Sequence, residues 1–423
     1  MKRLTNFLLL NSLVLSSALY AQSPTLPAPD EKSSVKNYSK VIGWPAGVMP
    51  VAPQGFKVSK FAEGLQSPRW MYVLPNGDVL VAEAKTEEKN PIKQIGAMVT
   101  GAAKSASPAT PGNRITLYRD VNKDGEYELK EFFITGLTQP FGMQLIGNQL
   151  YVANSDSLWK FPYKKGDKRI KARATKVMDL PSGGRHWTKN IIANESGSKI
   201  YIAVGSASDH AEDGIDKENK RAAILEINPD GSGERIYASG IRNPVGMGWS
   251  KGALWTAVNE RDELGNDLVP DYLTEVKEGG FYGWPYSYWG KNPDPRLKGE
   301  GAEKVKEAIE PNLSLGAHTA SLGLAFYNQK SFPEKYHHGA FIGQHGSWNR
   351  DVLSGYKVAF VPFKDGKPSG PQEDFLVGFV SNLKNSEVHG RPVGVVVLPD
   401  GSLLVADDAS NVIWKVSYVG DKK

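Results

Sequence analysis

The chain contains 423 residues, of which 40% are hydrophobic and 23% are charged, and its formal net charge is +5. These values are ordinary for a globular protein, and the charge is too small to indicate a nucleic-acid or anionic-membrane partner. The absence of cysteine excludes disulfides, thiolate metal sites, a cysteine nucleophile and thioether-linked haem.

The N-terminus has the pattern of an export signal. Two basic residues, Lys2 and Arg3, precede an apolar run, and small residues follow up to Ala21. The apolar run is shorter than the ~20 residues that a membrane span needs, so we expect a signal peptide over residues 1–21 and a periplasmic or secreted protein. The next stretch, residues 22–50, begins with a run rich in Pro, Ser and Lys and is expected to be a flexible lead-in.

One phrase recurs along the rest of the chain: a Gly-Leu or Gly-Ile pair or a proline, a short apolar strand, a turn and a second apolar strand. The equivalent apolar residues of the six copies are Met71, Met143, Ile191, Met247, Leu324 and Val395. A propeller blade of four short strands needs ~40–50 residues, so the longer spacings between copies indicate loop insertions. We expect two of them at residues 89–112 and 291–310.

A third strand follows most copies, usually with a fourth behind it. The expected third strands are Ile115–Arg119, Leu158–Phe161, Ala223–Ile227, Tyr356–Pro362 and Val412–Val416. The last copy lacks a fourth strand, whereas Phe56–Phe61 precedes the first copy as a spare one. Because an open propeller would leave exposed edges, we expect an all-β, six-bladed β-propeller over residues 51–419, closed by pairing of the N- and C-terminal strands. An irregular β-sandwich is the alternative.

In a radial fold, the residues just before each first strand meet at one mouth of the central channel. Here they are Arg69, Gln139, His186, Arg242 with Asn243, Ala320 and Arg391. Guanidinium groups bind carboxylates in a fixed fork, so three arginines and a histidine predict a site for a ligand with several negative charges. An arginine taken alone more often forms a surface ion pair, so it is the common place of the three in the repeat that favours a binding site. His186 is the candidate proton acceptor, and His345 is the second candidate.

A local motif indicates calcium. Asp120, Asn122 and Asp124 are followed by Gly125 and Glu131 at the spacing of a calcium-binding loop. The flanks have strand rather than helix character, so the alternative is a hairpin loop whose side chains cap their own backbone.

Several segments together resemble the glucose/sorbosone dehydrogenase family, six-bladed propellers that use pyrroloquinoline quinone (PQQ). The resemblance covers residues 51–419, and the segments that carry it are Gly184–His186, Gly240–Met247, Asn259–Glu263, Gly279–Pro285 and His389–Arg391. The segment from His345 to Arg350 differs from that of the soluble glucose dehydrogenases and is more similar to the sorbosone- and pyranose-dehydrogenase branch.

The resemblance implies an oxidoreductase that oxidises a sugar (an aldose, a sorbosone-like aldehyde or a sugar alcohol) by hydride transfer to PQQ. His186 would be the general base and Arg242 the electrophile, while the electron acceptor would be external and not NAD. A calcium ion would bind the backbone carbonyls of Glu260 and Arg261. The implied cofactor-binding residues are Arg69, Arg242, Asn243, His345, Trp348 and Arg391.

Two other functions stay open. A calcium-dependent lactonase or hydrolase would hold calcium on the channel axis, for which Glu83, Asn154 and Asp407 are the candidates. A non-catalytic ligand-binding propeller would retain the arginines without turnover.

Overall fold

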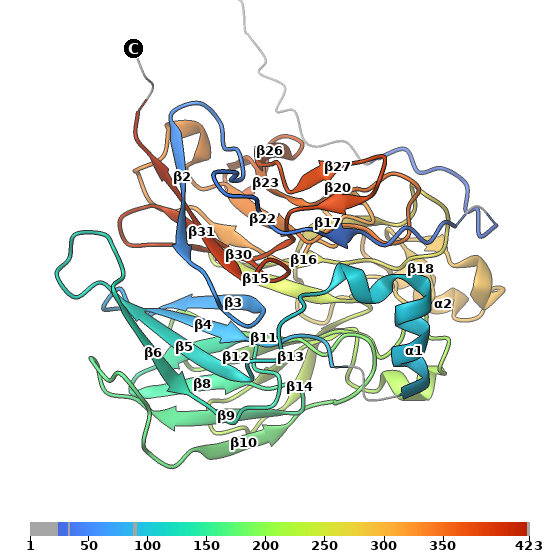
Figure 1. Ribbon diagram of the computed structural model, residues 1–423. Coiled ribbons are helices and arrows are strands. Elements are labelled where there is room, and N and C mark those ends of the chain that lie inside the picture. The colour runs from blue at the N-terminus through green and yellow to red at the C-terminus, as the bar shows by residue number, and fades with distance from the viewer. Residues whose placement is uncertain (1–23, 33, 88–90, 421–423) are drawn as a thin grey trace, which may run out of the picture.

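The computed structural model describes residues 24–32, 34–87 and 91–420, and it is dominated by strands (Figure 1). The expected signal peptide, residues 1–21, lies outside the described residues. The helical elements are short: α1 (Pro91–Thr100), η1 (Ala102–Ser105), η2 (Ile215–Glu218), η3 (Pro295–Leu297), α2 (Ala302–Glu307) and η4 (Glu334–Tyr336). The expectation of a nearly all-β chain is therefore confirmed.

Within the described residues, six sheets have four antiparallel strands each. The first three are formed by β3 (Pro68–Val73), β4 (Val79–Glu83), β5 (Arg114–Arg119) and β6 (Leu129–Ile134); by β7 (Met143–Ile146), β8 (Gln149–Ala153), β9 (Ser157–Pro162) and β10 (Thr175–Asp179); and by β11 (Lys189–Ala193), β12 (Ile200–Val204), β13 (Ala223–Ile227) and β14 (Arg235–Ser239). Each of these sheets is a meander of consecutive strands.

The other three sheets follow the same plan. They are formed by β15 (Pro244–Ser250), β16 (Ala253–Val258), β17 (Pro270–Glu275) and β20 (Leu313–Ala317); by β21 (Ala325–Phe326), β22 (Ala340–Gln344), β23 (Lys357–Val361) and β26 (Glu373–Leu376); and by β29 (Pro392–Val397), β30 (Leu403–Asp407), β31 (Val412–Tyr418) and β2 (Phe56–Ala62). The last sheet unites the two ends of the chain, because β2 pairs antiparallel with β31 from Phe56 opposite Tyr418 to Ala62 opposite Ile413. The expected pairing of N- and C-terminal strands is therefore present.

The first strands of the six sheets contact one another in sequence, and β29 of the last sheet contacts β3 of the first. Glycine makes this close approach possible. A side chain at Gly142 would lie 2.5 Å from the backbone nitrogen of Ile191, and one at Gly394 would lie 2.5 Å from the carbonyl oxygen of Arg69. Second strands such as β12 are buried along their whole length because neighbouring sheets cover both faces.

The two expected insertions join strands that pair directly. Glu83 at the end of β4 lies opposite Arg114 at the start of β5, so the insertion that carries α1 and η1 leaves the sheet intact. The second insertion carries η3 and α2 between β17 and β20. The remaining short strands are β18 (Ser287–Tyr288) with β19 (Asn292–Pro293), β24 (Phe363–Lys364) with β25 (Lys367–Pro368), and β1 (Lys40–Val41) with β28 (Glu387–Val388) and β27 (Val380–Asn382).

The expected flexible lead-in makes specific contacts over its described residues. Strand β1 pairs in parallel with β28, and this segment runs beside the C-terminal sheets in Figure 1. The Trp44 ring packs at 5.0 Å from Trp414, and its Nε1 donates to Asp407. The lead-in therefore differs from the expectation, because Trp44 packs on the last sheet and Tyr38 stacks on Trp348 in the loop after β22.

Candidate active site

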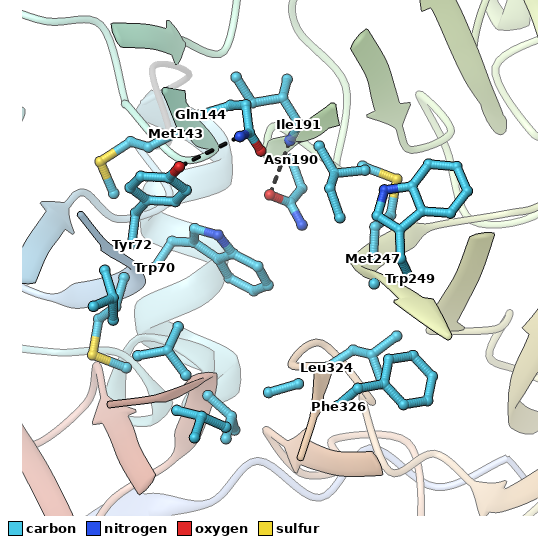
Figure 2. Close-up of a pocket in the computed structure, with 18 of the residues that line it drawn as sticks. Trp70, Tyr72, Met143, Gln144, Asn190, Ile191, Met247, Trp249, Leu324 and Phe326 are labelled. Carbon is cyan, nitrogen blue, oxygen red and sulfur yellow. Dashed lines mark hydrogen bonds between the residues drawn. The ribbon is translucent and has the colours of Figure 1, made fainter. Parts of the chain in front are cut away.

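The first strands of the six sheets lie against one another, and the two ends of this group of strands have different linings. Figure 2 shows one end, a pocket of 350 Å³ lined by the later residues of the first strands. Aromatic and aliphatic side chains such as Trp70, Tyr72 and Trp249 dominate it, and no described residue that lines it is charged. A ligand with several negative charges would find no counter-charge there.

The other end carries the residues that precede the first strands. We call it the arginine mouth and define it by Arg69, His186, Arg242, His345 and Arg391. The structure brings these residues together in two clusters. The cluster around Arg69 meets the cluster around His186 where the Arg69 guanidinium lies 5.5 Å from the ring centre of Trp187.

The first cluster is centred on Asp408, which the sequence did not reveal as a site residue. One carboxylate oxygen of Asp408 accepts from Arg69 at 2.7 Å, and the other lies 2.8 Å from Nε2 of His345. Burial and the nearby Arg391 guanidinium lower the pKa of His345 to about 4. His345 is therefore neutral at physiological pH, and the charge of Arg69 is balanced by Asp408.

Arg391 differs from Arg69 because its side chain forms no direct ion pair among the described residues, although Asp408 is close enough to interact with its charge. Its guanidinium donates to the backbone carbonyls of His345, Gly346 and Ser105 at 3.0–3.1 Å. Ser105 belongs to η1, so the first insertion contributes to this mouth. The Arg391 side chain is thus held in a fixed orientation, and its guanidinium is not directly paired with a carboxylate.

The second cluster is centred on Arg242, which is buried and fully hydrogen-bonded. Its Nη1 donates to the carbonyls of Asn259 and Glu260 at 2.9 and 2.7 Å, and its Nη2 pairs with Asp209. Burial acts to lower the pKa of Arg242, but Asp209 and Asp262 hold it above the usual value. The neighbouring Asn243 has a buried amide oxygen without a hydrogen-bond partner.

His186 lies beside this cluster, in the environment that a base requires. Its Nδ1 lies 3.0 Å from the carbonyl oxygen and 2.9 Å from Oγ of Ser206, and that Oγ donates its own hydrogen to Ser208. Both neighbours of Nδ1 are therefore acceptors, which places the imidazole proton on Nδ1 and the lone pair on Nε2. Burial and the Arg242 charge hold the pKa of His186 well below its usual value, so the ring is neutral.

The remaining cofactor candidate, Trp348, approaches the Arg242 cluster through Asp262. Trp348 donates from Nε1 to Asp262 at 3.1 Å, and Tyr38 of the N-terminal segment stacks on it with ring centres 5.6 Å apart. His318 approaches the other oxygen of Asp262 at 2.8 Å. Asp262 and His318 are thus further members of the site that the sequence did not single out as a pair.

The two predicted calcium sites, at Glu260 and Arg261 and in the peripheral loop, have different surroundings. The carbonyl oxygen of Glu260 already accepts from Arg242, while the Arg261 side chain pairs with Asp294. In the peripheral loop, both oxygens of Asp120 accept from backbone N–H groups, and Asn122 donates to Asp124. Glu131 points to Arg169 instead, at 2.7 Å, so the structure does not bring it together with the loop.

The carboxylates that a calcium hydrolase would use, Glu83 and Asp407, also have separate partners. Glu83 accepts from Arg114 between β4 and β5, and Asp407 accepts from Trp44 and from the backbone of Arg391. Among the described residues, these carboxylates form no common metal-ligand group with each other.

The chain is similar to several known proteins. The model of the "Glucose / Sorbosone dehydrogenase" family matches residues 153–347, and the "TrAA12-like" model matches residues 293–419. An uncharacterized protein of Borreliella burgdorferi is 32% identical over 299 residues, which cover 67% of this chain and 76% of that protein. The aldose sugar dehydrogenase YliI of Escherichia coli is 30% identical over 181 residues, which cover 38% of this chain and 46% of YliI.

A solved structure has the same fold. It is the holo form of the PQQ domain of pyranose dehydrogenase from Coprinopsis cinerea, with a TM-score of 0.71, 19% identity, and coverage of 90% of this chain and 100% of that domain. The matched part of YliI is about half of its length, so YliI's activity is not thereby assigned to this chain. The chain belongs to the glucose/sorbosone dehydrogenase family.

Proposed function

We propose that the protein is an exported, PQQ-dependent oxidoreductase that oxidises a sugar by hydride transfer to the quinone. The observation that carries the proposal is His186, whose Nδ1–H is held by Ser206 while Nε2 has no hydrogen-bond partner among the described residues. Membership of the family supports the reaction type. The cofactor and the substrate class, an aldose, a sorbosone-like aldehyde or a sugar alcohol, rest on relatives named for PQQ and for aldose sugars.

The residues present fit PQQ, which carries three carboxylates. Arg391 offers an oriented guanidinium whose side chain forms no ion pair among the described residues, whereas the unpartnered amide oxygen of Asn243 is an acceptor and does not match a carboxylate. Arg69 contributes less because Asp408 already balances it. His345 and Trp348 line the same mouth. We propose that the backbone carbonyls of Glu260 and Arg261 hold a calcium ion there.

When bound, PQQ supplies the ortho-quinone that accepts the hydride. In this scheme Nε2 of His186 takes the proton from the sugar hydroxyl, which is worth about 10²–10⁴-fold in rate. Arg242 provides a fixed positive charge beside that imidazole and stabilises negative charge as it develops. Arg391 binds a carboxylate, because a guanidinium matches its geometry.

We also propose that the six four-stranded sheets are blades of one closed six-bladed β-propeller over residues 51–419. The pairing of β2 with β31 and the contacts between successive first strands support this. Export to the periplasm or medium is proposed from residues 1–21. The described residues contain no helix with the length and apolar character needed to cross a bilayer.

The proposal is tested by titrating PQQ into the calcium-loaded protein and following dye reduction over a panel of aldoses and sugar alcohols. We expect saturable PQQ binding and turnover of at least one sugar. Arg391→Ala should weaken PQQ binding by about 1.5–3 kcal/mol, the contribution of a hydrogen bond to a charged group. Arg169→Ala is the control, since Arg169 pairs with Glu131 away from the mouth. Absence of PQQ binding would refute the proposal, and binding without any turnover would favour a non-catalytic protein.

A further inference from the structure

We propose that Asp209, His210 and Glu263 form a binding site for a divalent first-row transition-metal ion at the rim of the arginine mouth. Their candidate ligand atoms all lie within 4.8 Å of one another. Asp209 and His210 belong to the loop after β12, and Glu263 belongs to the loop after β16. The site goes beyond the proposed dehydrogenase function and does not depend on it.

The first argument is that two buried polar atoms face each other without a hydrogen bond. Asp209 is 1% exposed, and its Oδ1 receives hydrogen bonds from Arg242 and from the backbone of Asp262, but its Oδ2 has no hydrogen-bond partner. Nδ1 of His210 lies 3.6 Å from that Oδ2 and 3.2 Å from Oε2 of Glu212, and its geometry makes a hydrogen bond to neither. A separation of 3.6 Å is too long for a hydrogen bond. Buried unsatisfied polar atoms call for an explanation, and an ion between them is one.

The second argument is the distance between Oδ2 of Asp209 and Nδ1 of His210. Metal–nitrogen and metal–oxygen bonds of about 2.0–2.2 Å place neighbouring ligands of a tetrahedral ion about 3.4 Å apart. The 3.6 Å between Asp209 and His210 is close to that spacing. Imidazole nitrogen and carboxylate oxygen are both ligands that zinc and other first-row ions accept, whereas calcium takes six to eight oxygen ligands.

The third argument is that neighbouring residues hold the ligands in position. Glu212 accepts hydrogen bonds from the backbone N–H groups of both Asp209 and His210, at 3.1 and 2.8 Å. Its Oε2 also lies 3.2 Å from Nδ1 of His210, so it is available as a fourth oxygen. Arg296 donates to Oε2 of Glu263 at 3.2 Å, which orients that carboxylate. Such outer contacts are characteristic of metal centres.

The charges around the site permit a cation. Four arginines act on it, and each one has a carboxylate partner. Arg242 pairs with Asp209 through the oxygen that is not offered to the metal, Arg185 pairs with Glu212, Arg296 pairs with Glu263 and Glu31, and Arg261 pairs with Asp294. His210 and Glu263 are partly exposed, so an ion can enter from solvent.

The test uses the full chain without a histidine tag, stripped of metal and free of PQQ. We expect Co²⁺ to bind one per chain with visible d–d absorption and Zn²⁺ to displace it. His210→Ala and Glu263→Gln should each weaken Co²⁺ binding at least about 100-fold, more than loss of an outer contact does. His337→Ala is the matched control, because the ring of His337 contacts the carbonyl of Phe332 on a different part of the protein.

Three results would overturn the proposal. They are the absence of a Co²⁺ spectrum, equal affinity in the wild type and His210→Ala, and displacement of Co²⁺ by an equal concentration of Ca²⁺. Thermal unfolding of each variant confirms that it is folded before binding is measured. Because the readout is the bound metal, failure of this inference leaves the dehydrogenase proposal untouched.

Discussion

At the scale of single residues, His186 gives the most direct test of chemistry. A base must be neutral to act, so activity should rise with pH as the imidazole loses its proton. Because burial and Arg242 hold the pKa of His186 well below its usual value, kcat/KM should already be level near neutral pH and should fall only in the acid range, below about 6.5. His186→Gln should lose about 10²–10⁴-fold in turnover and abolish this inflection.

The control for that prediction is His345→Gln. His345 sits in the same mouth, but its Nε2 is engaged by Asp408, so the variant should retain the acid inflection. If His186→Gln reduces a dye at the wild-type rate with an accepted sugar, His186 is not the base. His345 would then replace it as the candidate.

Asp408 offers a test of stability rather than of chemistry. It is the counter-charge of the buried Arg69 and also contacts His345. Asp408→Ala should lower the free energy of unfolding by about 3–5 kcal/mol, because it leaves a buried guanidinium without a counter-charge. Asp365→Ala removes an exposed pair with Lys251 and should change stability by less than about 1 kcal/mol. Urea unfolding measures both, and a similar small loss in the two variants would contradict this account.

At the scale of elements, the loop after β12 packs closely between His186 and Asn243, on the Arg242 side of the arginine mouth. A side chain at Gly205 would lie 2.4 Å from Oδ1 of Asn243 and 2.5 Å from Cβ of His186. Gly205→Ala should therefore push these residues apart, cost about 1–3 kcal/mol of stability and reduce turnover. Gly96→Ala in α1 is the control, since nothing lies within 4 Å of the new methyl group. Unfolding and dye reduction that match those of Gly96→Ala would show that the mouth tolerates the extra methyl group.

The elements also show how far the sequence was informative. The repeated apolar phrase located the strands well because the inner strands of each sheet are buried between two neighbouring sheets, as β12 is. It did not locate β17, since that strand begins with a proline and contains Asp271. The structure accounts for this residue: its carboxylate accepts from the backbone of Glu260 and Ser321. A polar residue satisfied by distant loops has no local pattern.

The same reason explains which site residues the sequence missed. Arg69, Arg242 and Arg391 share one place in the repeat, and this made them visible. Asp209 and Asp408 lie in loops after second strands, and their roles depend on partners that are 33 and 339 residues away along the chain. Repeat position therefore identified the cations of the site, whereas three-dimensional structure was needed to identify their counter-charges.

At the scale of the whole molecule, the sheet that joins the chain ends is the feature to test. Strand β2 pairs with β31 over its whole length, and the backbone N–H of Val419 donates to the carbonyl of Gly55. Its Phe56 ring also packs against Phe332, Tyr336 and Phe375, so this strand connects the last sheet to the one before it. Loss of β2 would expose the edge of β31 and leave these rings uncovered.

We therefore expect that deleting residues 50–62 prevents cooperative folding. The measurement is urea unfolding followed by both far- and near-ultraviolet circular dichroism, in which the two transitions should separate or disappear. Deleting α1, residues 91–100, is a control of similar size, because the described side chains of α1 are mostly exposed and β4 and β5 pair without it. That variant should keep a single transition. A single transition in the variant without residues 50–62 would mean that the other five sheets hold the fold together without closure by β2.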